Sequence, residues 1–158
     1  MGEKRAKGLE DRGQRRSHED KNAQRELPFA SDQEFKRRVV HYSDIPLVEL
    51  VPGANSHLIF GEKITVSFLT MSANSYFPPH RHEAEQIMVV VDGYADEIVE
   101  GKLYRLKKGD VILLPSNIEH GACLREVECR VIDIFSPPRQ DYREKYDGVI
   151  QKTKERRG

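Results

Sequence analysis

Three histidines and one glutamine have the residue types and the spacing of a metal site. His80 and His82 stand two residues apart, shortly before an apolar run that begins at Gln86. In a strand, residues two apart project to the same face, so both imidazoles and the Gln86 side chain are expected to point together. His120 follows a second apolar run after a short turn. The pattern predicts one divalent metal ion bound by His80, His82, Gln86 and His120.

Three imidazoles and one oxygen donor suit Fe, Mn, Ni, Co or Zn, and the sequence does not choose among these metals. A neutral amide in place of a carboxylate leaves the ion close to its full charge, which favours Lewis-acid chemistry. One alternative ligand is Glu85, which a bulge between residues 82 and 86 would turn inward. We interpret His18, His41 and His57 as ordinary surface or core residues.

Short runs rich in β-branched and aromatic residues provide the elements that must position this site. They predict strands at 47–50, 57–60, 64–70, 86–92, 95–100, 102–105, 111–114 and 128–135. Asp92-Gly93 and Glu100-Gly101 are typical of tight hairpins. Because helices do not alternate with these strands, an antiparallel sandwich or barrel is favoured over a doubly wound sheet.

The first histidine segment resembles the first motif of the cupin superfamily, G-x5-H-x-H-x3/4-E-x6-G. His80, His82 and Gly93 match it, whereas Asn74 replaces the leading glycine and Gln86 replaces the glutamate.

The second segment resembles the partner motif, G-x5-P-x-G-x2-H-x3-N. Gly109, Pro115 and His120 match, whereas Asn117 replaces the glycine and Leu124 the asparagine. The resemblance covers about residues 40–140. It implies an all-β fold, an antiparallel double-stranded β-helix or jelly-roll barrel with the metal inside, and commonly a homodimer.

A third run, from Asp133 to Arg139, ends the last predicted strand. It resembles the D-x-F-x-P-x-R run of the small cupins of pectin degradation, which open cyclic 4,5-unsaturated uronates into linear keto sugars. The resemblance implies that Asp133 is the acid/base, Phe135 a pocket wall and Arg139 the bidentate partner of the sugar carboxylate. In the alternative interpretation, Asp133 bonds to a loop and Arg139 pairs with Asp141.

The fold alone leaves the reaction open, because cupins host many chemistries. We expect a small-molecule substrate, and uronate ring opening is one hypothesis. The others are a different metal-dependent cupin enzyme such as a dioxygenase, and a non-catalytic ligand-binding or sensor cupin.

Composition sets the domain organisation. The 158 residues suit one domain. Residues 1–28 carry many charges and hardly any apolar side chains, which predicts a disordered extension. We assign residues 29–142 to the cupin barrel and residues 143–158 to a charged tail; a frayed helix or a tail is expected for the segment from Asp141 onward.

Charge and hydropathy exclude several partners. Lys plus Arg and Asp plus Glu both number 26, which gives no net charge and argues against a nucleic-acid binder. No apolar run reaches the roughly 18 residues of a membrane helix, and no secretory signal begins the chain. These features predict a cytoplasmic protein. Its two cysteines, Cys123 and Cys129, are too few for a disulfide framework; a bridge between them is an alternative, and we interpret them as buried free thiols.

Overall fold

The computed structural model describes residues 28–156 and 158. The extension predicted at 1–28 therefore falls almost entirely outside the described residues. The chain divides into two compact units between Val39 and Val40. In the first unit, helix α1 (Asp32–Arg38) begins at a capping box in which the Ser31 and Glu34 side chains each bond the other residue's backbone N–H. The second unit begins at Val40 rather than at the predicted residue 29.

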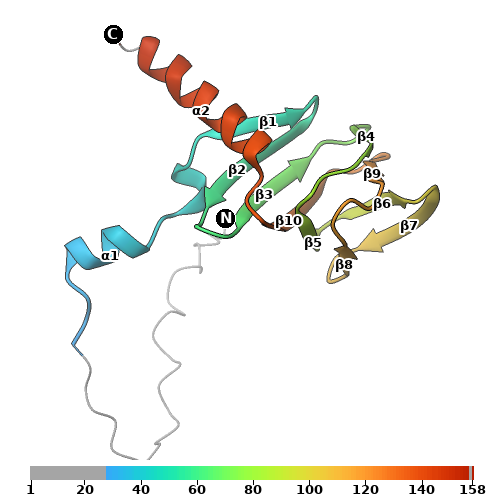
Figure 1. The fold of residues 1–158 in the computed structure, drawn as a ribbon, viewed down its shortest axis with the longest axis horizontal. Helices are drawn as coiled ribbons and strands as arrows, with labels where there is room; N and C mark the ends of the chain where they lie inside the picture. The colour runs from blue at the N-terminus through green and yellow to red at the C-terminus, as the bar shows by residue number, and fades with distance from the viewer. Residues whose placement is uncertain (1–27, 157) are drawn as a thin grey trace, which may run out of the picture. The chain divides into compact units, whose positions relative to one another are not determined.

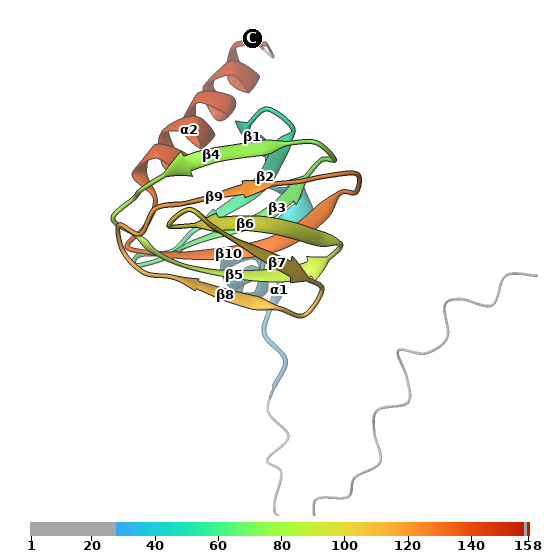
Figure 2. The same ribbon diagram turned by 90° about the vertical axis from the view of Figure 1, so that its right-hand side faces the viewer.

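The described part of the second unit folds into two antiparallel sheets (Figures 1 and 2). The six-stranded sheet has the order β1-β2-β3-β10-β5-β8, and the four-stranded sheet has the order β4-β9-β6-β7. The strands are β1 (Leu47–Val51), β2 (Ala54–Phe60), β3 (Thr65–Met71), β4 (Tyr76–His80), β5 (Glu85–Asp92), β6 (Tyr94–Val99), β7 (Lys102–Lys107), β8 (Val111–Leu114), β9 (His120–Cys123) and β10 (Cys129–Ser136). This is the predicted all-β barrel.

All eight predicted strands are present, and two further strands were missed. Strand β4 contains Pro78 and Pro79, which lack a ladder donor, but it lies at an edge of its sheet, where proline is tolerated. The prediction of a hairpin at Asp92-Gly93 is wrong, because β5 and β6 belong to different sheets. The Glu100-Gly101 hairpin is confirmed: β6 pairs with β7, and both turn residues have positive φ.

Two departures from the cupin motifs have a backbone explanation. Asn74 and Asn117 stand where the motifs have glycine, and their φ angles are 61° and 62°. Asparagine adopts this left-handed region more readily than most residues, so the turns survive without glycine. At Gly93 glycine itself is required, because a Cβ there would lie 2.3 Å from the Glu128 carbonyl oxygen.

Helix α2 (Gln140–Glu155) follows the last strand and contributes to the core of the second unit. Tyr142 is buried, and the Tyr146 ring packs edge-on against Phe60 of β2. The Lys145 ammonium donates to the Leu50 carbonyl at 3.1 Å. The predicted charged tail at 143–158 is therefore largely a helix attached to the barrel, and the predicted boundary at 142 falls within it.

Cys123 and Cys129 are free thiols that lie in different sheets. Burial raises the pKa of Cys129 to about 11. No helix in the described ranges is long and apolar enough to span a membrane.

The outer face of the six-stranded sheet is apolar across its middle. Strand register aligns one residue from each of five strands in a single row: Leu113, Ile87, Ile134, Val66 and Ile59. Leu113, on the edge strand β8, is 68% exposed. Solvated sheet faces are usually polar, and a contiguous apolar patch marks an interaction surface.

Candidate metal centre

The three predicted histidines meet at one end of the barrel. His80 ends β4 and lies opposite His120, the first residue of β9, in the strand register. His82 comes from the loop before β5, so the parity expected of a continuous strand does not place it. The Asn117 N–H donates to the His82 carbonyl at 2.8 Å and holds this loop in place. One nitrogen from each imidazole lies within 4.8 Å of the others.

Backbone carbonyls fix which nitrogen of each ring carries the proton. The Nδ1 atoms of His80, His82 and His120 lie 2.9, 2.7 and 3.0 Å from the carbonyl oxygens of residues 78, 84 and 118, respectively. A carbonyl only accepts, so each Nδ1 holds the hydrogen and each Nε2 has a free lone pair. Burial lowers the pKa of His120 to about 4 and is also the main cause that lowers the pKa of His82. Both rings are therefore neutral at pH 7, as metal ligands must be.

Gln86 adds an oxygen to this cluster. Its Nε2 donates to Asp133 Oδ1 at 2.8 Å, which turns Oε1 toward His82 Nε2 at 3.3 Å. Two lone pairs then face each other, an arrangement that a cation between them would stabilise. The Nε2 of His120 is buried without a hydrogen-bond partner. The donor set thus fits a divalent metal, whereas Glu85 is exposed on the opposite face of β5.

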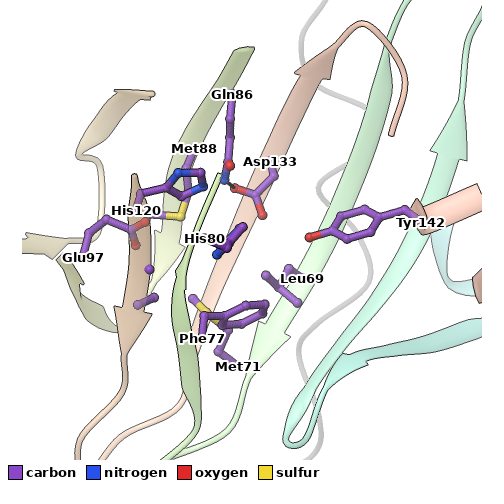
Figure 3. A pocket seen from close by; sticks show the side chains of 12 residues that line it. Leu69, Met71, Phe77, His80, Gln86, Met88, Glu97, His120, Asp133 and Tyr142 are labelled. Carbon is purple, nitrogen blue, oxygen red and sulfur yellow. Dashed lines mark hydrogen bonds between the residues drawn. The ribbon is translucent and has the colours of Figure 1, made fainter. Parts of the chain in front are cut away.

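A small cavity of about 30 Å³ adjoins the histidines, enough for about two water molecules. Figure 3 shows the residues that line it. The lining side chains are polar (His80, His120, Gln86, Asp133, Glu97, Tyr142) and apolar (Leu69, Met71, Phe77, Met88, Ala122).

Asp133 occupies the position expected of an acid/base. It projects from β10 into the cavity and is 3% exposed. Burial raises its pKa to about 7, partly offset by the Gln86 hydrogen bond and the charge of Arg139. A carboxyl group with a pKa near neutrality can both take and return a proton.

Two polar residues of the cavity, Glu97 and Tyr142, were not predicted from the sequence. Glu97 alternates with Ala95 and Val99 on the inward face of β6, and a carboxylate among such neighbours was a readable signal. Tyr142 comes from α2, and nothing in its local sequence indicates that this helix reaches the cavity.

Arg139 and Phe135 make contacts that the resemblance does not imply, and their roles in the site stay predictions. One bidentate edge of the Arg139 guanidinium, formed by Nε and Nη2, already donates to Asp141 at 2.8 and 2.7 Å. This is the alternative pairing considered above. Nη1 is buried and without a partner in the described structure, so the other edge, formed by Nη1 and Nη2, still has N–H groups to donate. Phe135 packs edge-on against His82 and Tyr142, and it is not among the residues that line the cavity.

The fold and the site together define a class. Two antiparallel sheets enclose a three-histidine centre whose ligands come from two separate sequence segments, in the order and spacing of the cupin motifs. In agreement, residues 67–135 match the family model described as Cupin domain. The chain therefore has the fold of a cupin barrel and resembles the cupin superfamily in its motifs and in the segment that matches the family model.

Comparison with individual proteins narrows the resemblance. The chain is 29% identical over 108 residues to the pectin degradation protein KdgF of Dickeya dadantii (strain 3937), covering 67% of this chain and 98% of that protein. The solved structure of KdgF from Halomonas sp. is 29% identical, with a TM-score of 0.59 over 63% of this chain and 93% of that one. An RmlC-like cupin from Shewanella frigidimarina NCIMB 400 is 23% identical, with a TM-score of 0.62 over 66% and 95%.

Proposed function

We propose that this protein is a metal-dependent cupin enzyme that opens the ring of a 4,5-unsaturated uronate. One observation carries the proposal: Asp133 lines the cavity together with His80 and His120 and accepts a hydrogen bond from Gln86. The chain is similar to two KdgF proteins, one of which is described as a pectin degradation protein, and this supports an unsaturated uronate as the substrate class. A dioxygenase would have less use for a proton-transfer group at this point.

His80, His82, His120 and Gln86 would hold a divalent metal, which supplies Lewis-acid activation of a substrate oxygen when bound. Asp133 removes the proton of the ring hydroxyl, and Gln86 keeps the carboxylate aimed at it. Arg139, whose charge reaches both His82 and Asp133, offers the N–H groups of its unpartnered Nη1 and an electrostatic attraction for the substrate carboxylate. A whole sugar ring is larger than the cavity, so only its reacting edge enters.

The test is conversion of an unsaturated uronate by the purified protein, followed by its loss in Asp133→Asn. Asparagine keeps an acceptor oxygen for Gln86 but cannot take a proton, so turnover should fall about 10²–10⁴-fold with unchanged metal content. An exposed matched control, Asp147→Asn on α2, should retain the wild-type rate. Wild-type turnover by Asp133→Asn would refute the role of Asp133, and no turnover by any form would favour the ligand-binding hypothesis.

A further inference from the structure

A second buried carboxyl group lines the cavity, and the proposed function leaves it without a role. Glu97 is 3% exposed, and its Oε2 has no hydrogen-bond partner in the described structure. A buried, unpartnered polar atom is costly to the fold. Such a carboxyl group is a candidate for binding a ligand or exchanging a proton with it.

The neighbouring residue shows what a structural carboxylate looks like in the same strand. Asp96 is 1% exposed and accepts hydrogen bonds from Arg105 at 2.7 Å and from Arg125 at 3.0 Å. No comparable cation faces Glu97 among the described hydrogen bonds and ion pairs. Glu97 is also outside the cluster whose ligand atoms lie within 4.8 Å of one another, which contains the three histidines. Glu97 therefore has neither an ion-pair role nor a place in the metal cluster.

The two cavity carboxyl groups come from opposite sheets. Glu97 projects from β6 of the four-stranded sheet, and Asp133 from β10 of the six-stranded sheet. In Figure 3 they lie on either side of His80, and both face the space beside it. Their separation across one cavity suits a reaction that takes a proton at one substrate atom and delivers a proton at another.

We propose that Glu97 is the catalytic acid of this site and donates a proton to the substrate from the wall opposite Asp133. This inference rests on the proposed ring opening, which needs both transfers. Asp133 takes the proton of the C1 hydroxyl, the C1–O5 bond breaks, and C1=O1 forms. The electron pair released to O5 forms C5=O5, the C4=C5 double bond becomes single, and C4 takes the proton of Glu97.

The net change is an isomerisation without an oxidant or reductant. Asp133 ends with one proton more and Glu97 with one fewer, and solvent restores both. Burial and the charge of Asp133 raise the pKa of Glu97 to about 8, so Glu97 carries a proton to give near neutral pH.

The experiment compares wild type, Glu97→Gln and the exposed control Glu144→Gln, all loaded with metal, on an unsaturated uronate in D₂O. Glutamine has the shape of a protonated glutamate but transfers no proton, so turnover should fall about 10²–10⁴-fold with unchanged metal content. Wild type and the control should place deuterium on one face of C4. The residual product of Glu97→Gln should carry deuterium on both faces, because solvent then protonates a released enol.

A wild-type rate in Glu97→Gln overturns the inference. So does a slow variant that still labels one face, because Glu97 would then only position the substrate. Infrared spectra of the metal-loaded protein without substrate separate this inference from the proposed function. The C=O band of protonated carboxyl groups should lose one component in Glu97→Gln, whereas the component of Asp133, whose pKa is also raised, should remain in both forms. If wild type converts no uronate, the proposed function fails. A band component lost in Glu97→Gln then still supports Glu97 as a protonated acid in the cavity, and an unchanged band overturns that assignment.

Discussion

Glu97 should make the stability of the metal-free protein fall as the pH rises. Burial, reinforced by the charge of Asp133, raises its pKa from the usual 4.5 to about 8, so the folded state keeps a proton that the unfolded state releases. Between these two pKa values the unfolded chain binds fewer protons, and the free energy of unfolding therefore decreases with pH. At about 1.4 kcal/mol for each pKa unit, the upper bound of the loss is about 5 kcal/mol.

Glu97→Gln removes this loss, because glutamine is neutral at every pH. We expect the variant to match wild type at about pH 5 and to be more stable by several kcal/mol, at most about 5, at about pH 9. The assay is urea unfolding of chelator-treated protein at both pH values. The control Glu144→Gln, on the exposed side of α2, should follow wild type at both. A difference between Glu97→Gln and wild type that does not grow with pH would refute the reasoning.

Three further predictions concern the metal and the outer face. Gln86→Glu should bind a divalent metal more tightly, because it adds negative charge, as titration calorimetry can measure. It should also lose turnover in the uronate assay, because a second carboxylate replaces the N–H group that donates to Asp133 at 2.8 Å. Unchanged metal affinity argues against Gln86 as a ligand. Elemental analysis should show that His120→Ala loses the metal. The control His57→Ala should retain it, because the His57 ring bonds to a backbone carbonyl outside the site. Full metal retention in His120→Ala contradicts the assignment. The apolar row on the outer face of the six-stranded sheet predicts that two copies of the chain pair there. Leu113→Lys should therefore lower the mass measured by light scattering from two chains to one. Equal masses of wild type and variant argue against pairing through this face.

The sequence predicted the barrel because its strands are signalled locally, by alternating apolar residues and by turns at glycine and asparagine. It also predicted the histidine cluster, although for a partly wrong reason. His82 lies in a loop and is aligned by backbone contacts from residues 84 and 117 rather than by the parity of a strand. The motif spacing carried that information, since it encodes the loop as well as the strands.

The errors share a physical cause, which is that contacts between distant segments override local patterns. Asp92-Gly93 has hairpin residues, but the chain crosses there from one sheet to the other. Arg139 has the residue type of a carboxylate clamp, but one edge of its guanidinium already bonds the Asp141 carboxylate two residues away. Glu97 and Tyr142 reach the cavity only because the second sheet and α2 close around it.

The predicted ligands are distributed over both sheets, and this has a consequence for the protein's resistance to unfolding. His80 and His120 belong to the four-stranded sheet and Gln86 to the six-stranded sheet, so a bound ion would fasten the two layers together. The unfolded chain offers no such arrangement, so every tenfold rise in free metal above the dissociation constant adds about 1.4 kcal/mol to the stability. The supply of metal in the surrounding medium would then set the temperature at which the barrel opens.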